Sequence, residues 1–454
     1  MFRTLAVAAL VSSCLLACIP PGAAGVGADG GSTVNVPSEC PAAGTPTPHQ
    51  SSITVSESWS GAHLLKYDTS IEAGVTITLA PCAVLLLEPG HELKVKGVLD
   101  AQGEPAHPVT ITRAGAAAWA TLRVVGPGQL RLVNTRVEGG GDPLNWGHDL
   151  VGMIVATGDR GQPTQEVVHV EHVVLSGSAS NGIVLLEGAG FSAASTDLRI
   201  DGAAGYPMSI WSRSAGTVPS GRYTGNAVDE ILLPTNALAE QITMEDVTLH
   251  ERGVPYHVGA VDSSGELRVG TMPGEPVRTL TIEPGTTLRF KRNGLLAVEH
   301  YGGSEPASGA LYAVGTNEKP IIFTSAEPAP MAGDWLGISF GGTPSDGSRI
   351  AFATVQYAGG VSSSGSSACP YPKPLGVVLS AAIRIAGRGK PSTQFVTDTT
   401  IADSLTHGID RGWRDFDKLD FIASNTFVNI GACLQTYPSD DIDQCPEAPP
   451  CPVN

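Results

Sequence analysis

The sequence GALYAVGTNEKPIIFT, residues 309–324, has a close counterpart earlier in the chain. Residues 97–112 read GVLDAQGEPAHPVTIT, and the two stretches share glycine, leucine, alanine, glycine, proline and threonine at matching positions. Each contains two short apolar runs with a glycine between them, which predicts two β-strands joined by a turn. Because the pattern occurs twice, we expect an architecture that is built from repeated units.

The similarity extends beyond these two stretches. Residues 78–87 align with residues 281–290 at an offset of 203 (281 minus 78), and Trp119 aligns with Trp335 at an offset of 216 (335 minus 119). The offset changes because insertions lie at turns, which stacked coils tolerate since their loops project sideways. A β-sandwich needs no such repeat, and a propeller needs one about every 40 to 50 residues. We therefore predict an all-β solenoid, a parallel β-helix, with an internally duplicated block of several coils.

The composition agrees with a chain of strands and turns. The 454 residues include 55 glycines and 34 prolines, whereas only 16% are charged, so turns are frequent and helix-favouring residues are scarce. Hydrophobic residues make up 42% of the chain, enough to bury a core. The formal net charge of −17 argues against nucleic acid as a partner, because phosphates are bound by clustered lysines and arginines.

Residues 1–17 have the pattern of a bacterial signal peptide. A basic residue is followed by an apolar run from Leu5 to Ala17, which is too short to span a bilayer as a helix. The run ends in LLAC, residues 15–18, which resembles the lipobox of bacterial lipoproteins. The resemblance implies cleavage before Cys18 and acylation of its thiol and new amino terminus, which would anchor the chain in a membrane. The alternative is an ordinary export signal, cleaved further along, that discards Cys18.

Three regions follow the signal. Residues 18–51 start with the lipidated cysteine and are rich in proline, glycine and serine without apolar periodicity, so we expect a flexible tether. Residues 52–433 carry the alternating strand pattern and are the predicted β-helix domain. Residues 434–454 are a tail rich in cysteine and proline.

The cysteines fit an exported chain. Without Cys14 and Cys18 an even number remains, as expected for disulfides in an oxidising compartment. These six are Cys40, Cys82, Cys369, Cys433, Cys445 and Cys451. Many pairings are open to six cysteines, and our working assignment joins Cys40 to Cys82, Cys369 to Cys433 and Cys445 to Cys451. Zinc is disfavoured because no C-x-x-C spacing occurs.

Several segments resemble lipoproteins with a right-handed parallel β-helix of the pectate-lyase-like class, of the myxobacterial kind. They are LTIEPGTTLRF (280–290), GALYAVGTNEKPIIFTS (309–325), GDWLGISF (333–340) and the LLAC start. The resemblance covers residues 52–433 and implies right-handed coils and a lipid-anchored place in the cell envelope. Ile19, rather than an acid, follows Cys18, which points to the outer membrane. No activity is implied, because such coils serve lyases, hydrolases and adhesins alike.

The densest charged segment is HGIDRGWRDFDKLDF, residues 407–421. A sugar ring could stack on its tryptophan beside several carboxylates. The predicted glycan-contact residues are Asp410, Arg411, Trp413, Arg414, Asp415 and Asp417. The alternative, which we favour, is a solvated loop with local ion pairs at a coil corner.

No motif specifies a metal or catalytic site. In HVEH, residues 169–172, a strand would place His169 and Glu171 on one face and His172 on the other, so three ligands do not converge. SDDID, residues 439–443, lacks the spacing of a calcium loop, which leaves calcium as a weak alternative. Motifs of serine hydrolases, zinc proteases and nucleotide-binding proteins are absent from the sequence. We predict no catalytic residue, no metal and no cofactor.

These observations predict a membrane-anchored lipoprotein of the cell envelope whose β-helix is a binding or structural surface, with polysaccharide as the candidate ligand. The alternative is a polysaccharide lyase or glycoside hydrolase that acts on acidic or cell-wall glycans. Pectate-lyase-like enzymes gather aspartates that hold calcium and use an arginine or lysine as base, and this sequence does not match that pattern residue by residue. We therefore lean towards a protein that is not an enzyme.

Overall fold

The computed structural model describes residues 39–143, 151–236, 240–270, 275–298, 308–361, 369, 380–414, 419–439 and 451. They belong to one compact unit, Ser38–Asn454. Within these residues nearly all regular structure is β, and helical structure is limited to 3-10 turns, chiefly η2 (Ser212–Thr217). No helix in the described part of the chain is long and apolar enough to cross a membrane.

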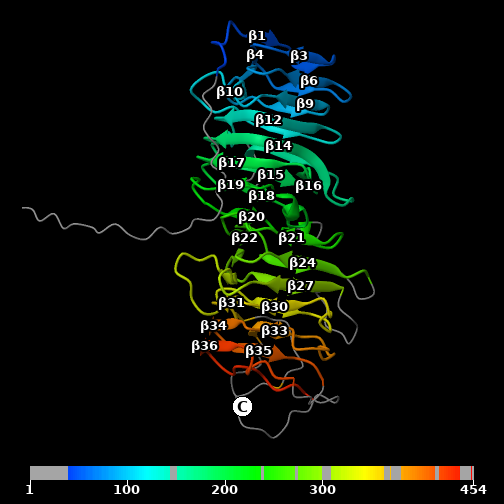
Figure 1. Cartoon of the computed structure of the whole chain (residues 1–454), viewed down its shortest axis with the longest axis vertical. Helices are drawn as coiled ribbons and strands as arrows, with labels where there is room; N and C mark the ends of the chain where they lie inside the picture. The colour runs from blue at the N-terminus through cyan, green and yellow to red at the C-terminus, as the bar shows by residue number, and fades with distance from the viewer. Residues whose placement is uncertain are drawn as a thin grey trace, which may run out of the picture. The chain divides into compact units, whose positions relative to one another are not determined.

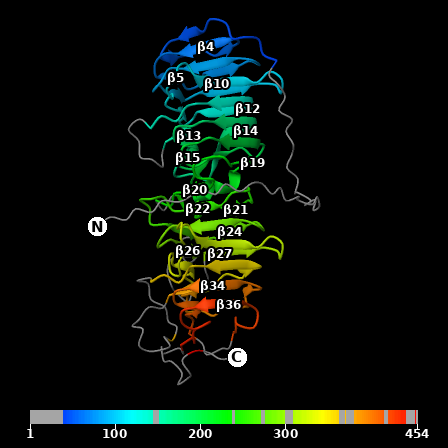
Figure 2. The ribbon, with the colours of Figure 1, turned by 90° about the vertical axis from the view of Figure 1, so that its left-hand side faces the viewer.

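The strands form four sheets in which every pairing between named strands is parallel (Figures 1 and 2). The largest has 14 strands, in the order β2 (Ser52–Ile53), β5 (Thr69–Ile71), β8 (Leu93–Val95), β11 (Leu122–Val124), β13 (Gly152–Thr157), β15 (Asn181–Leu186), β18 (Met208–Ile210), β20 (Ile231–Leu233), β22 (Tyr256–Val258), β25 (Thr287–Phe290), β28 (Ile321–Ser325), β31 (Ala353–Gln356), β34 (Thr400–Ser404) and β36 (Thr426–Ile430).

The other three sheets divide the chain between them. The 12-stranded sheet takes strands from the N-terminal half: β1 (Thr47–His49), β3 (Glu57–Trp59), β4 (Ala62–Leu65), β6 (Thr76–Leu79), β7 (Val84–Leu87), β9 (Val98–Gln102), β10 (Val109–Arg113), β12 (Gln129–Glu138), β14 (Gln165–Ser176), β16 (Ala189–Phe191), β17 (Thr196–Asp201) and β19 (Gly221–Arg222). One 5-stranded sheet contains β21 (Val247–Leu249), β24 (Arg278–Ile282), β27 (Gly309–Val314), β30 (Arg349–Ala351) and β33 (Val396–Thr397). The other contains β23 (Glu266–Val269), β26 (Leu295–Val298), β29 (Gly337–Phe340), β32 (Ala381–Ile385) and β35 (His407–Arg411).

The chain visits the sheets in turn and returns to each of them one strand further along. Strands β24, β25 and β26 lie in three different sheets, and the next three strands, β27, β28 and β29, pair with them in the same order. Parallel neighbours therefore always come from different passages of the chain, as parallel pairing requires. The predicted all-β class and the predicted stacking of parallel strands are confirmed.

Alternation along each strand builds the core. In β6 and β7 every second residue is buried, because successive side chains of a strand point to opposite faces. The inward residues stack in register on those of the next strand, as Leu288 does on Phe323. Together they form one continuous hydrophobic cluster that extends in sequence from Ile53 to Phe421. Burying each such side chain stabilises the fold by about 1.5–3 kcal/mol.

The two copies of the repeated stretch fold alike. In each, a glycine ends the first strand where a side chain would strike the next layer of backbone. A Cβ on Gly103 would lie 2.2 Å from the carbonyl oxygen of Asn134, and one on Gly315 would lie 2.4 Å from that of Phe352. The aligned tryptophans are both fully buried, and each indole Nε1–H donates to a backbone carbonyl 2.9 Å away. The two copies therefore share individual contacts as well as sequence.

Equivalent strands of the two copies nevertheless lie in different sheets. β10 belongs to the 12-stranded sheet, but its counterpart β28 belongs to the 14-stranded sheet. Likewise β11 is part of the 14-stranded sheet, whereas β29 is part of a 5-stranded sheet. The reason is that the 12-stranded sheet ends at β19 and the 5-stranded sheets begin at β21 and β23, while the 14-stranded sheet continues through both halves.

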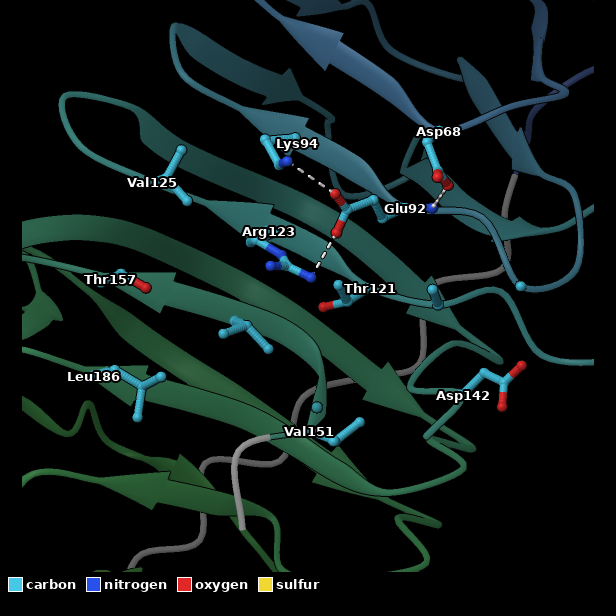
Figure 3. Close-up of a pocket in the computed structure, with 14 residues that line it drawn as sticks. Asp68, Glu92, Lys94, Thr121, Arg123, Val125, Asp142, Val151, Thr157 and Leu186 are labelled. Carbon is cyan, nitrogen blue, oxygen red and sulfur yellow. Dashed lines mark hydrogen bonds and ion pairs between the residues drawn. The ribbon is translucent and has the colours of Figure 1, made fainter. Parts of the chain in front are cut away.

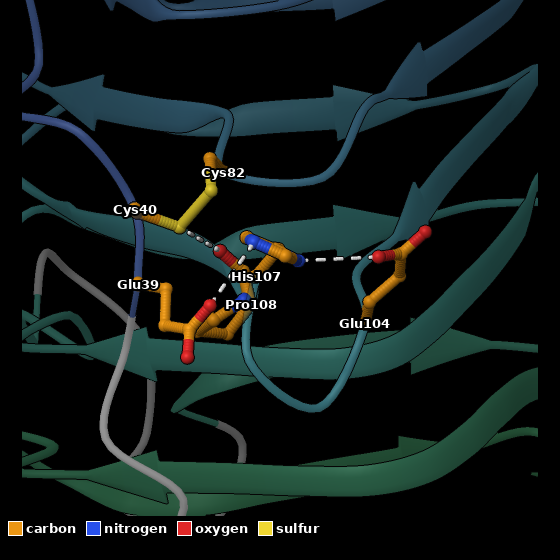
Figure 4. Close-up of a disulfide and its surroundings, with 6 residues drawn as sticks. All are labelled: Glu39, Cys40, Cys82, Glu104, His107 and Pro108. Carbon is orange, nitrogen blue, oxygen red and sulfur yellow. Dashed lines mark hydrogen bonds and ion pairs between the residues drawn. A yellow bond between two sulfur atoms is a disulfide. The ribbon is translucent and has the colours of Figure 1, made fainter.

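The disulfides tie chain ends to this core. Cys40 is bonded to Cys82, as predicted, which fixes the segment before β1 to the turn after β6 (Figure 4). Cys433 is bonded to Cys451, and Cys369 is also in a disulfide. The predicted Cys369–Cys433 and Cys445–Cys451 pairings are therefore wrong, because Cys451 lies at a Cα–Cα distance of 5.3 Å from Cys433 and takes its thiol. Cys18 and Cys445 lie outside the described residues.

The ordered structure extends past both predicted boundaries of the β-helix domain. Strand β1 starts at Thr47, inside the segment that was expected to be a tether. At the other end, Gln435 and Ser439 continue parallel pairing, with Ile409 and Arg414 respectively. Gln435 and Ser439 are thus part of the stacked structure.

Candidate functional site

A groove of about 530 Å³ crosses one face of the 14-stranded sheet in its N-terminal half (Figure 3). Its walls come from β8, β11, β13 and β15 and from the turns that precede or follow strands of this sheet. The lining residues are Asp68, Gly90, Glu92, Lys94, Ala120, Thr121, Arg123, Val125, Asp142, Val151, Gly152, Val155, Thr157 and Leu186. Because strands are about 4.8 Å apart, a groove that spans five strand positions is about 19 Å long.

Strand alternation explains which side chains reach the groove. In β8 the leucine and valine are buried and Lys94 points to the opposite face, and β11 repeats the arrangement with Arg123. Parallel register places Lys94 beside Arg123 and Arg123 beside Val155. The three side chains therefore form a row across consecutive strands on the face that does not enter the core.

Ion pairs organise the charged wall. The carboxylate of Glu92 accepts from Lys94 Nζ at 3.2 Å and from Arg123 Nη2 at 2.7 Å (Figure 3). At one end of the groove, Asp68 Oδ1 accepts from the Glu92 backbone N–H at 3.1 Å and lies 3.1 Å from His91 Nδ1. Figure 3 shows Asp142 apart from these pairs. The two cations thus share one carboxylate inside the groove.

The rest of the lining combines apolar and hydroxyl groups. Val125, Val151, Val155 and Leu186 offer aliphatic surface, and threonines add hydroxyls. Such a lining suits a ligand with apolar faces and several hydroxyl groups, because each kind of surface finds its complement. In the described part of the chain no three His, Cys, Asp or Glu residues gather as a metal site would require.

The segment that was predicted to contact glycans lies in the interior. Trp413 and Asp410 are fully buried and Arg411 is nearly so. The guanidinium of Arg411 donates to the carbonyl oxygens of Thr436 and Leu419, and burial lowers its pKa to about 10. Neither a stacking platform nor a solvated loop describes these three residues, because Asp410 and Arg411 lie on the enclosed strand β35 and Trp413 is itself fully buried.

The remaining members of that segment add little to a surface site. Arg414 is half-buried, and its backbone N–H donates to the carbonyl of Arg388. Asp415 and Asp417 lie outside the described residues. The alternation predicted for HVEH breaks at His172, which has a left-handed backbone (φ 54°) and, like Glu171, lies outside the core. His169 Nδ1 bonds to Ser192, whereas His172 Nδ1 bonds to Asp197. The two histidines do not share a site.

A second charged cluster on the 14-stranded sheet was missed by sequence reasoning. Glu230 accepts from His257 Nδ1 at 2.6 Å and also pairs with Arg289, which lies beside His257 in register. Burial opposes ionisation of Glu230, but the hydrogen bond from His257 and the charges of both partners outweigh it and hold its pKa below the ordinary value. The sequence does contain these three residues at or beside neighbouring strands. They can be recognised as a cluster only when the register of those strands is known.

No protein family, curated protein or solved structure matches the chain. A function therefore has to be argued from the groove and from the sequence signals around it.

Proposed function

We propose that this chain is a lipid-anchored protein of the bacterial cell envelope that binds polysaccharide along the groove of a right-handed parallel β-helix. The regular return of the chain to each sheet supports a helix of coils. Anchoring rests on the LLAC pattern at residues 15–18, and outer-membrane placement rests on Ile19.

We infer the binding role above all from a groove whose lining residues come from consecutive strands of one sheet. At the usual spacing of strands these positions span about 19 Å. An extended polymer fits a groove of this kind better than a compact ligand does, because successive units of the polymer meet successive strands. The lining combines charged, hydroxyl and apolar side chains, which suit a sugar chain with hydroxyls and apolar ring faces.

Removing one charged side chain from the groove tests this proposal. We expect Arg123→Ala to weaken glycan binding by the full-length chain about tenfold, which corresponds to roughly 1.4 kcal/mol. The matched control is Arg131→Ala, which removes the same charge from β12 in the 12-stranded sheet, where Arg131 is 56% exposed. Binding is measured on a panel of neutral and acidic oligosaccharides by calorimetry.

The same incubations distinguish a binding protein from an enzyme. We expect no new reducing ends and no absorbance from unsaturated products. Release of either product would replace the binding role by the alternative, a polysaccharide lyase or glycoside hydrolase that acts on acidic or cell-wall glycans. Equal binding by the Arg123→Ala and Arg131→Ala variants would remove the groove from the proposal.

The lipid anchor is tested separately in cells. Cys18→Ser is expected to move the protein from the membrane fraction to the soluble fraction, because the acyl chains have no other attachment point in the proposed lipobox. Cys14→Ser is the matched control and should leave the protein in the membrane fraction. If the Cys18→Ser variant also stays there, the anchor is not a lipid on Cys18.

A further inference from the structure

An exposed aromatic side chain lies next to one end of the groove. Tyr67 is 61% exposed and directly precedes Asp68, which lines the groove. Its ring meets the ring of His91 edge-on, with 6.3 Å between centroids, and His91 lies between the lining residues Gly90 and Glu92. A tyrosine ring that is left open to solvent beside a polar groove offers an apolar face on which a sugar ring can pack.

The carboxylate beside this ring has capacity for a ligand. Asp68 uses Oδ1 for the Glu92 backbone N–H and for His91, and its side chain is 71% exposed. Its second oxygen, Oδ2, has no hydrogen-bond partner among the described residues. A carboxylate oxygen is a strong acceptor for hydroxyl donors. Stacking on Tyr67 and hydrogen bonding to Asp68 can therefore act on the same sugar unit.

The charge of the groove selects against acidic ligands. Its lining holds three carboxylates, Asp68, Glu92 and Asp142, and two cations, Lys94 and Arg123, which gives a formal charge of −1 (two minus three). Both cations are already paired with Glu92. The whole chain carries a formal charge of −17, so its long-range field also repels polyanions.

We propose that the groove takes a neutral, hydroxyl-rich glycan and that Tyr67 is the ring on which one sugar unit stacks. The inference rests on the proposed function and adds to it the ligand class and a specificity-determining residue. It separates this groove from a site for uronates, which would need unpaired cations facing the ligand.

The test compares two classes of oligosaccharide with the full-length chain. Neutral probes are oligomers of β-1,4-linked glucose and of N-acetylglucosamine, and the acidic probe is an oligomer of galacturonic acid. We expect binding of a neutral probe with little dependence on salt, because no ion pair with the ligand forms. Tyr67→Ala should weaken this binding at least tenfold, while Tyr67→Phe, which keeps the ring, should retain it.

The matched control is Tyr312→Ala. Tyr312 is also exposed, at 43%, but it lies on β27 in a 5-stranded sheet, so its loss should not change binding. Preference for the galacturonate oligomer would overturn the neutral ligand and leave polysaccharide binding intact. Unchanged neutral binding by the Tyr67→Ala variant would overturn the stacking role. Failure of every glycan to bind would instead overturn the proposed function and this inference with it.

Discussion

Replacing Trp335 by alanine is expected to lower the free energy of unfolding by about 3–5 kcal/mol. The indole is fully buried and stacks on Phe290 with 4.3 Å between ring centroids. Its Nε1–H also satisfies the carbonyl oxygen of Gln356. The substitution therefore leaves a cavity in the core and removes the hydrogen bond from the indole to this carbonyl. Urea denaturation, monitored by far-UV circular dichroism because this signal does not depend on the replaced tryptophan, measures the change in the free energy of unfolding.

Two further variants make this result specific. Trp119→Ala should cost a similar amount, because the aligned indole is equally buried and bonds to the carbonyl of Glu138 in the same way. Tyr312→Ala changes an exposed ring and should stay within about 0.5 kcal/mol of the wild type. A loss below about 1 kcal/mol for both tryptophan variants would mean that these rings do not fill the core.

Acid is expected to destabilise the protein through His407, which is nearly enclosed. Burial lowers the pKa of His407 from 6.5 to about 4, and its Nδ1 accepts from the Cys433 backbone N–H. The unfolded chain thus binds the proton at a higher pH than the folded chain does. The contribution of neutral His407 to the free energy of unfolding is therefore fully present above about pH 6.5 and is lost progressively as the pH falls towards 4. We expect a loss of about 2 kcal/mol between about pH 8 and about pH 5.

His407→Asn should remove most of this pH dependence, because its amide oxygen can still accept from Cys433 but does not titrate in this range. His49 adds a smaller part of the same sign, since burial, and then the charge of His63, lower its pKa. Free energies of unfolding at several pH values between 8 and 5 give the comparison. If the substituted protein kept the full acid slope, His407 would not be the group responsible.

The stacking of strands could be predicted from the sequence because a repeated alternating pattern carries it. Each copy contains its own strands, its own glycine turn and its own tryptophan, so local chemistry and the global arrangement agree. Gly103 and Gly315 illustrate this, because both are required by a carbonyl of the next layer. The same pattern does not say which sheet a strand joins, since that depends on where neighbouring sheets begin and end.

The groove could not be predicted in the same way. Its charged residues Asp68, Glu92 and Arg123 are separated along the chain and meet only through the register of strands β5, β8 and β11. The segment around Trp413 was selected instead because its charges are adjacent in sequence. Adjacency does not imply exposure, and in β35 both faces of the strand are covered.

The change of sheet between the two copies has a consequence for binding stoichiometry. The residue that aligns with Arg123, at the same offset as the tryptophans (123 plus 216), is Ser339, and it lies on β29 in a 5-stranded sheet. The aligned segment therefore does not repeat the charged row of Lys94 and Arg123 at this position. If the groove binds the proposed ligand, we expect it to take one ligand per chain, while the aligned segment presents a different surface on a different sheet.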